Sequence, residues 1–320
     1  METLNLARLA KEYSDEGAAR LKFETMRWGK DCQNVTCPKC GVIGQPNSYR
    51  VKVGAGSSTR EGVWRCRSCK KQFTVTVGTV FEDSHVPLTK WLLALHLLSA
   101  SKKGMSAHQI HRMLGVRYQT AWFMMHRLRY AMSVEPIAAK LRGVVEMDET
   151  YMGGKRKYGK GRWPSFTRKA VSVVALVERD GRARAFPMER IDAENVHQAI
   201  YKHVDQLNAE MMTDEAHHYG GGDRIGRMQH TRINHGRGEY VNGRAHTNTV
   251  EGFFSLLKRG IVGTFHHIGT EHLQRYCDEF AFRYSARKVD DATRAEMIYK
   301  GSEGKRLTYK QPARSSEGLA

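Results

Sequence analysis

The sequence predicts a multidomain α/β protein in which a zinc ribbon and a helix-turn-helix domain precede a larger mixed-sheet domain. Three observations lead to this prediction: two Cys-x-x-Cys pairs near the start, two helical segments separated by a glycine, and an alternation of strand and helix patterns from Arg142 onward. We expect five parts: an N-terminal helical segment over residues 1–36, the zinc ribbon over 37–82, the helix-turn-helix domain over 83–138, the mixed-sheet domain over 139–300 and a C-terminal tail over 301–320.

Composition indicates a globular protein with a polyanionic partner. The chain has 320 residues, 40% of them hydrophobic, and a formal net charge of +19. Such an excess of basic residues favours nucleic acid as the partner. The basic residues are spread over globular segments and no apolar run is long enough to span a bilayer, so we expect no membrane role. The first residues carry no signal pattern, and we expect a cytoplasmic, nucleoid-associated protein.

Cysteine spacing predicts a structural zinc site. Each Cys-x-x-Cys turn aims two thiolates at one point, and two such turns complete a tetrahedral Zn²⁺ site. The four cysteines are Cys37, Cys40, Cys66 and Cys69. Four cysteine ligands leave no open position, so this zinc supports folding and not catalysis. The polar, glycine-rich stretch between the pairs favours a two-stranded ribbon with a long hairpin. The basic residues around the pairs are either a solvated face or phosphate contacts.

Helical patterns occupy the residues on both sides of the ribbon. Apolar side chains at helical spacing predict a helix over residues 14–29, and residues 88–100 are apolar enough for a buried helix. Residues 106–115 and 118–129 then form a pair of helices around Gly115, which is the pattern of a helix-turn-helix. The second helix of that motif enters the major groove. The residues that open it and could contact DNA are Arg117, Tyr118, Gln119 and Thr120.

The largest unit begins with a strand predicted over residues 144–148. A basic, glycine-rich loop follows and could track a phosphate backbone, with DNA contacts expected from Lys155, Arg156 and Lys157. A hairpin over residues 170–188, a helix over 194–205 and a strand over 210–214 come next. A second helix is predicted over 247–259. This order indicates an α/β unit with a mixed sheet.

Acidic residues stand at the ends of these predicted elements. Asp148 ends or interrupts the first strand, Asp214 ends a later strand and Glu251 lies in the first turn of the last helix. Neighbouring strands would bring the two aspartates together, and a helix packed beside them could add the glutamate. Clustered carboxylates repel unless divalent cations neutralise them, and oxygen ligands select Mg²⁺ or Mn²⁺. We therefore expect two Mg²⁺ or Mn²⁺ ions acting on a phosphodiester.

Two features of this acidic set have alternatives. Asn248-Thr-Val-Glu251 also fits a capping box, in which Glu251 would bond to the amide of Asn248. Lys258 lies seven residues after Glu251 on the same helix face, and it either holds a substrate phosphate or is a solvated lysine. Adjacent residues on a strand point to opposite faces, so Glu149 and Glu215 should not share the site with the aspartates that precede them.

The combined motifs resemble the DDE transposases of bacterial insertion sequences, in the group with an N-terminal zinc ribbon. The resemblance extends over residues 16–287 and includes the cysteine pairs, Glu146-Met-Asp-Glu-Thr-Tyr-Met-Gly-Gly154 and Asn248-Thr-Val-Glu-Gly-Phe-Phe-Ser-Leu-Leu-Lys-Arg259. It implies an RNase H-like catalytic fold with Asp148, Asp214 and Glu251 as the catalytic triad and Lys258 as its companion. Some members of the family use an asparagine as the third residue, which here would be Asn248; we favour Glu251, because a carboxylate binds a hard cation better than an amide does.

The resemblance implies a protein that binds the terminal inverted repeats of its element, cleaves them with Mg²⁺ and joins the freed 3′-hydroxyl to target DNA. Its partner is then double-stranded DNA, both transposon ends and target. Joining two ends suggests a homodimer or a higher oligomer on DNA. The alternatives are a DNA-binding regulator with an inactive catalytic domain and a repair nuclease of the same fold.

Overall fold

The structure is a computed structural model that describes residues 6–44, 47–54, 56, 58–133, 139–153, 156–157, 165–166, 170–214, 224–233 and 246–308. The chain divides into two compact units. The first unit contains residues 1–132 and 289–320, and the second contains residues 133–288. No helix among the described residues is long and apolar enough to cross a membrane.

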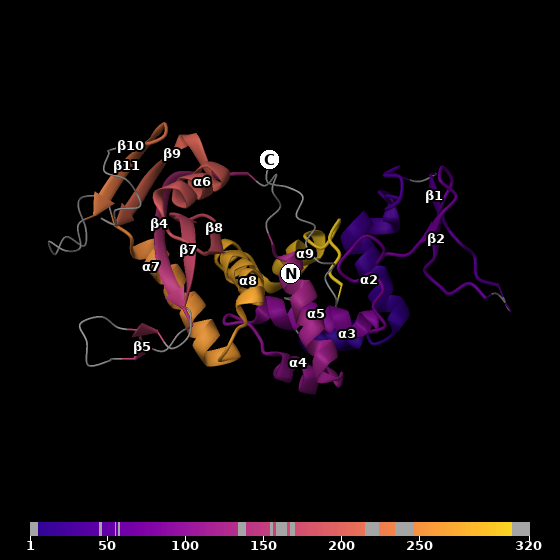
Figure 1. Cartoon of the computed structure of the whole chain (residues 1–320). Helices are drawn as coiled ribbons and strands as arrows, with labels where there is room; N and C mark the ends of the chain where they lie inside the picture. The colour runs from indigo at the N-terminus through magenta and orange to yellow at the C-terminus, as the bar shows by residue number, and fades with distance from the viewer. Residues whose placement is uncertain are drawn as a thin grey trace. The chain divides into compact units, whose positions relative to one another are not determined.

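The first unit is helical apart from its ribbon (Figure 1). Its helices are α1 (Leu6–Glu12), α2 (Glu16–Trp28), α3 (Leu88–Ala100), α4 (Ala107–Leu114), α5 (Tyr118–Ala131) and α9 (Asp291–Lys300), with a 3₁₀ turn η1 at Lys30–Cys32. The predicted helices over 14–29 and 88–100 are thus confirmed to within two residues. The capping box of Ser106 and Gln109 begins α4, and Gly115 ends it in the left-handed conformation.

The C-terminal helix α9 belongs to the first unit, whereas the sequence analysis placed its residues at the end of the catalytic domain. It packs on α3, and the ring of Tyr299 stacks on Phe81 and meets the edge of Phe23. All three rings are buried. α9 also packs on α5, and a Cβ on Gly301, directly after α9, would lie 2.4 Å from the carbonyl oxygen of Ala131. These aromatic contacts between distant segments could not be read from local patterns.

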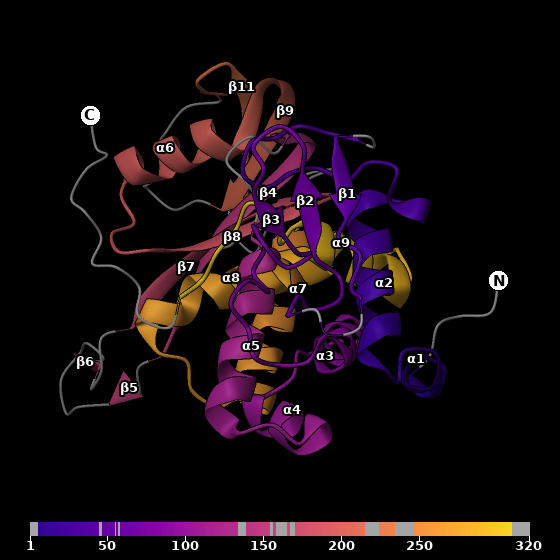
Figure 2. The ribbon, with the colours of Figure 1, turned by 90° about the vertical axis from the view of Figure 1, so that its right-hand side faces the viewer.

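The ribbon has three strands instead of the two expected. They are β1 (Ser48–Arg50), β2 (Trp64–Cys66) and β3 (Gln72–Phe73), paired antiparallel in the order β1-β2-β3 (Figure 2). The second cysteine pair lies in the turn between β2 and β3, and that turn brings the third strand alongside. Trp64 and Phe73 contact Trp28 edge-on, so the ribbon packs on the end of α2.

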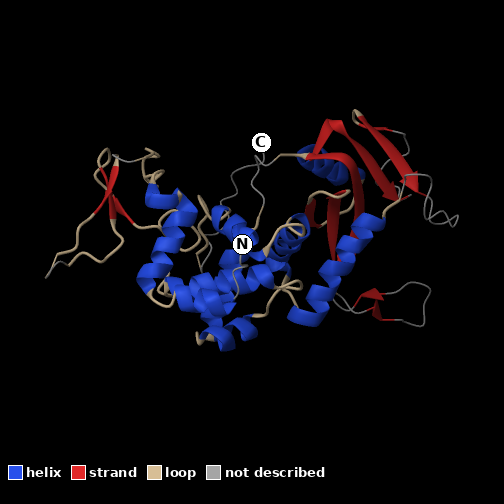
Figure 3. Cartoon of the chain, turned by 180° about the vertical axis from the view of Figure 1, so that it is seen from behind, coloured by secondary structure: helices blue, strands red, loops and turns tan. Residues whose placement is uncertain are grey.

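The second unit is built on a six-stranded mixed sheet in the order β10-β11-β9-β4-β7-β8. Strands are red in Figure 3. Its strands are β4 (Leu141–Met152), β7 (Val171–Glu178), β8 (Ala183–Met188), β9 (Val204–Asp214), β10 (Arg224–Ile225) and β11 (Met228–Ile233). β4 is antiparallel to β7 and parallel to β9, and β9 is parallel to β11. A separate pair, β5 (Arg156–Lys157) and β6 (Ser165–Phe166), extends from β4. The mixed sheet expected from the sequence is confirmed.

Helices cover both faces of this sheet. Helix α6 (Ala193–His203) packs on the face that carries Val145, Met147 and Leu176. Helices α7 (Asn248–Gly260) and α8 (Leu273–Ser285) pack on the face that carries Val173, Ala175 and Val177. A short π-helical turn, η4 (Ile261–Phe265), and a 3₁₀ turn, η5 (Thr270–His272), connect the last two helices. Even-numbered positions of β4 therefore face α7, and odd-numbered positions face α6.

Two strands are longer than predicted. β4 continues to Met152, beyond the acidic residues, because residues 145–152 pair with β7 along their whole length. β9 begins at Val204, directly after α6, so the last two residues of the expected helix are strand. Asp148 consequently lies within β4 and does not end it. Local propensity does not reveal these extensions, because the neighbouring strands supply the hydrogen bonds.

Candidate metal centres and active site

The four predicted zinc ligands converge in the first unit. The Sγ atoms of Cys37, Cys40, Cys66 and Cys69 all lie within 4.8 Å of one another. Sγ of Cys37 is 3.7 Å from that of Cys69, and Sγ of Cys40 is 3.7 Å from that of Cys66. A tetrahedral ion with Zn–S bonds of about 2.3 Å places sulfurs about 3.8 Å apart, whereas a disulfide needs about 2 Å. The spacing therefore fits a shared zinc ion and no disulfide.

Backbone amides favour the thiolate form of Cys66. The hydrogen bond from the backbone amide of Cys69, together with that of Ser68, lowers the pKa of Cys66 to about 6. A thiolate is the form that binds zinc. The donor set, its spacing and this local field all fit a structural Zn²⁺ ion. Cys32 and Cys277 are buried elsewhere.

The predicted catalytic acids occupy the centre of the sheet and the start of α7 in the second unit. Asp148 is in β4 and Asp214 ends the adjacent parallel strand β9. β4 and β9 pair as far as Glu146 and Met212, and Asp148 and Asp214 each lie two residues beyond that pair in their own strand. Both positions are even-numbered, on the sheet face opposite α6, and the charges of Asp214 and of Glu251, in the first turn of α7, act on Asp148. Glu149 faces the opposite side, as the strand alternation predicts.

Burial and neighbouring charges act together on Asp148. The pKa of Asp148 is raised to about 7, first by desolvation and then by the carboxylates of Glu149, Asp214 and Glu251, while a hydrogen bond from the backbone amide of Glu149 acts to lower it. That amide donates to Oδ1 of Asp148 over 2.7 Å. A carboxyl group that sits among three acids holds its proton unless a cation compensates the charge. The raised pKa of Asp148 therefore depends in part on the charges of Asp214 and Glu251, the other two predicted catalytic residues.

These carboxylates are not drawn together as tightly as the cysteines. Among the described residues, the four cysteines form the only group of three or more metal-binding side chains whose ligand atoms all lie within 4.8 Å. Like charges separate when no cation holds them, so a looser arrangement is expected of an acidic site. The donor set consists of carboxylate oxygens, which fits Mg²⁺ or Mn²⁺.

Helix α7 does not begin as a capping box. Its N-cap is Thr247, so Asn248 is the first helical residue and Glu251 is one residue too far along to bond to the N-cap amide. Instead, the hydroxyl of Thr247 donates to Oε1 of Glu251 over 3.2 Å. The alternative that Glu251 serves only to cap its helix is therefore wrong. Its side chain is held at the helix start and is exposed.

Glu146 belongs to the sequence motif around Asp148 and had no predicted role. Glu146 is fully buried. It accepts hydrogen bonds from the first turn of α7 and from Arg179. Burying a carboxylate requires such partners, and the even spacing of Glu146 and Asp148 on one strand was the available signal.

The residues that are predicted to contact phosphate or DNA differ in their solvent exposure. Lys258 is exposed, two turns after Glu251. Arg117, Tyr118 and Gln119 are exposed around the start of α5, while Thr120 is partly buried. The ring of Tyr118 stacks on His108 of α4. Lys155 lies outside the described residues, and only the backbone of Arg156 and Lys157 is described, in β5.

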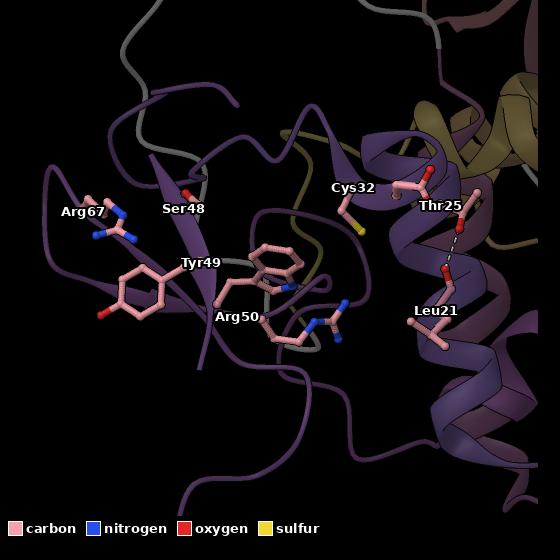
Figure 4. A pocket seen from close by; sticks show the side chains of 9 residues that line it. Leu21, Thr25, Cys32, Ser48, Tyr49, Arg50 and Arg67 are labelled. Carbon is pink, nitrogen blue, oxygen red and sulfur yellow. Dashed lines mark hydrogen bonds between the residues drawn. The ribbon is translucent and has the colours of Figure 1, made fainter. Parts of the chain in front are cut away.

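A hollow of about 760 Å³ lies between α2 and the ribbon in the first unit (Figure 4). Arg50 lines it, stacks on Trp64 and donates to the buried carboxylate of Glu24 over 2.6 Å. Arg67 stacks on the ring of Tyr49 at its exposed edge. The guanidinium of Arg50 is thus engaged within the protein, while Arg67 remains on the surface of the ribbon.

Comparison with known proteins identifies both units. Residues 140–285 match an ISXO2-like transposase domain, and residues 14–72 match a transposase zinc-ribbon domain. The chain belongs to the insertion-sequence transposases that carry an N-terminal zinc ribbon. Within that class its second unit is of the ISXO2-like type.

One curated relative and two solved structures are similar to the chain. An uncharacterized protein in transposable element ISH50 of Halobacterium salinarum is 26% identical over 287 residues, which is 85% of this chain and 92% of that protein. Two Mos1 structures are each 13% identical: the mariner paired-end complex with Mn, with a TM-score of 0.27, and the paired-end complex with left transposon end, with a TM-score of 0.26. They cover 65% and 66% of this chain and 74% of their own chains. TM-scores this low do not establish a shared fold.

Proposed function

We propose that this transposase binds the terminal inverted repeats of its insertion sequence and catalyses Mg²⁺-dependent strand cleavage and strand transfer. The observation that supports the proposal is the acidic environment of Asp148 in β4, where burial, first of all, and the carboxylates of Glu149, Asp214 and Glu251 raise its pKa to about 7. Acids arranged to disfavour their own ionisation mark a functional site. We assign Asp148, Asp214 and Glu251 as the residues that hold the divalent ions.

The sheet topology supports an RNase H-like assignment for this unit. The order β11-β9-β4-β7-β8 places β4 between an antiparallel and a parallel neighbour, and α6 leads from β8 to β9. This mixed arrangement agrees with the catalytic fold that the sequence motifs imply. Ligands from two adjacent strands and one packed helix would then surround the scissile phosphodiester.

Each residue of the proposed site would have its own role in the reaction. Bound Mg²⁺ would activate the attacking oxygen and stabilise the leaving oxygen of the phosphodiester. Asp148 and Asp214 supply carboxylates from rigid strands, and Thr247 orients that of Glu251 through its hydroxyl. Lys258, exposed on the same helix face, would contact a substrate phosphate. Water attacks first, and the freed 3′-hydroxyl then attacks target DNA.

DNA recognition is assigned to the first unit. The exposed residues at the start of α5 are placed to contact bases or phosphates if α4 and α5 act as a helix-turn-helix. The zinc ribbon adds Arg67 on its surface, and Lys155, Arg156 and Lys157 of the second unit remain proposed phosphate contacts. The net charge of +19 supports double-stranded DNA as the partner. Joining two ends calls for at least a homodimer on DNA.

Replacing Asp148 tests this assignment. We expect Asp148→Ala to reduce Mg²⁺-dependent cleavage of end-containing DNA by about a thousandfold or more, because a metal ligand is lost, with end binding retained. Glu149→Ala is the matched control, since Glu149 is the next acid on the strand and faces the opposite side; it should cleave nearly as well as the parent. Cleavage by the Asp148→Ala variant would refute the assignment. End binding without any cleavage by the parent chain would favour a DNA-binding regulator instead.

A further inference from the structure

Glu146 is a fully buried carboxylate whose partners come from three separate elements. It lies in β4, two residues before Asp148 and on the same face. Its Oε2 accepts the backbone amides of Thr249 over 2.8 Å and Val250 over 3.1 Å. Its Oε1 accepts the hydroxyl of Thr249 over 2.8 Å and Nε of Arg179 over 2.6 Å. Such a complete set of donors is what a buried carboxylate requires.

Glu146 lies in β4 and caps the start of α7, because its carboxylate accepts hydrogen bonds from the first turn of that helix. Thr249 and Val250 are the second and third residues of α7, whose amides lack partners within the helix. The helix N-cap residue, Thr247, gives its hydroxyl to Glu251 and does not cap with its side chain. A carboxylate at this end also interacts favourably with the helix dipole. The start of α7 is thus attached to β4 through one side chain.

Arg179 extends the attachment to the turn between β7 and β8. Its Nη2 donates to the carbonyl oxygen of His246, the residue before the N-cap, over 3.0 Å. Nδ1 of His246 lies 3.2 Å from Oε1 of Glu146. The chain entering α7 is therefore held on both sides of Thr247, by Arg179 before it and by Glu146 after it.

These contacts fix the distance between two of the proposed metal ligands. Asp148 follows Glu146 on a rigid strand, and Glu251 directly follows the amide of Val250 that Glu146 accepts. We infer that Glu146 is a positioning residue, which locks the first turn of α7 onto β4 so that Glu251 is held beside Asp148 for divalent metal binding. The inference rests on the proposed function, because it concerns the same site. Glu146 itself is committed to Arg179 and α7 and does not ligate the ion.

Glu146→Gln tests this role while preserving side-chain size. The amide group has one acceptor oxygen and no charge, so it cannot satisfy both the helix amides and Arg179. We expect Mn²⁺ affinity, titrated by electron paramagnetic resonance on the zinc-loaded full chain, to fall by about 10- to 100-fold, the usual loss for a residue that orients metal ligands. Cleavage should fall similarly, and end binding should stay within about threefold.

A second readout needs no metal. Hydrogen exchange at the amides of Thr249 and Val250 should accelerate by about tenfold or more in Glu146→Gln, with the later turns of α7 unchanged. If that variant does not fold, Thr249→Val removes only the hydroxyl donor and should weaken Mn²⁺ binding in the same direction by about threefold.

Glu178→Gln is the matched control. Glu178 is a buried acid on the adjacent strand β7 that pairs with Arg182 and accepts the amide of Arg142, without contact to α7. It should lose stability but keep Mn²⁺ affinity and cleavage within about threefold. Equal losses in Glu178→Gln and Glu146→Gln would overturn the inference, as would parent-like Mn²⁺ affinity in Glu146→Gln. Cleavage by Asp148→Ala, measured in parallel, would instead refute the proposed function; the exchange at Thr249 and Val250 would still show whether Glu146 anchors α7.

Discussion

At the scale of single residues, the three carboxylates of the site differ in their burial and in their hydrogen bonds. Glu146 is buried but fully hydrogen-bonded, so its charge is compensated within the protein. Asp148 is desolvated and receives one backbone amide, and its pKa is raised to about 7. Glu251 is exposed and oriented by Thr247. The residue that lacks compensation is the one expected to recruit a cation.

The raised pKa of Asp148 predicts a pH-dependent cost to stability in Mg²⁺-free buffer. Between the pKa of an aspartate in the unfolded chain, about 4, and the folded value of about 7, the folded protein holds the extra proton, so the contribution to stability is present at low pH and is lost as the pH rises through 7. Asp148→Asn removes this effect. Relative to the parent, its free energy of unfolding should increase from pH 5 to pH 8 by at most about 3 kcal/mol, because only the interval between pH 5 and the folded pKa of about 7 contributes.

Urea unfolding of both proteins at several pH values checks this. The exposed Glu194→Gln substitution is the control and should show no such trend. A difference between Asp148→Asn and the parent that stays constant with pH would contradict the burial of Asp148 among the other acids.

At the scale of elements, close packing decides which helix positions tolerate change. α7 contains two glycines in ordinary helical surroundings. A Cβ on Gly252 would meet nothing within 4 Å, whereas a Cβ on Gly260 would lie 2.1 Å from the buried ring of Phe280 in α8. The two positions share one helix, so they separate helix propensity from packing.

Gly252→Ala and Gly260→Ala should therefore have opposite effects on the second unit. Alanine is favoured over glycine in a helix, so Gly252→Ala should stabilise by up to about 1 kcal/mol. Gly260→Ala overpacks the contact with Phe280 and should destabilise by about 1–3 kcal/mol. Urea unfolding measures both. Equal effects of the two substitutions would mean that α7 and α8 are not packed as closely as described.

At the scale of the whole molecule, the chain consists of two compact units that depend on different stabilising devices. The first combines helices with a ribbon whose cysteines hold zinc, and the second has a sheet with apolar clusters on both faces. Structural zinc supplies folding free energy directly to the part that contains it.

Removal of zinc should consequently affect one unit and spare the other. We expect a strong chelator to accelerate hydrogen exchange through β1, β2 and β3, with the protection of β4, β7 and β9 retained. The parent should contain one zinc per chain by mass spectrometry, Cys69→Ser should lose it, and Cys277→Ser, far along the chain in α8, should keep it. Loss of protection in β4 on chelation would show that the units do not fold separately.

The sequence by itself determined the local features. Cysteine spacing specified the zinc ligands, helical periodicity specified α2, α3 and α7 to within about two residues, and strand alternation specified which acids share a face. The resemblance of the motifs indicated the transposase family, which the domain matches confirm. These features depend on residues close together in the chain, and a pattern can report them.

Tertiary structure decided the rest. Only the pairing of β4 with β9 brings the strands of Asp148 and Asp214 together, and only the contact across about a hundred residues shows that Glu146 caps α7. The same contact explains why the helix begins at Asn248 after Thr247 and not with the expected capping box. The physical reason is that a buried carboxylate needs hydrogen-bond donors. Here the donors come from elements that are distant in the sequence, and no local pattern connects those elements to the carboxylate.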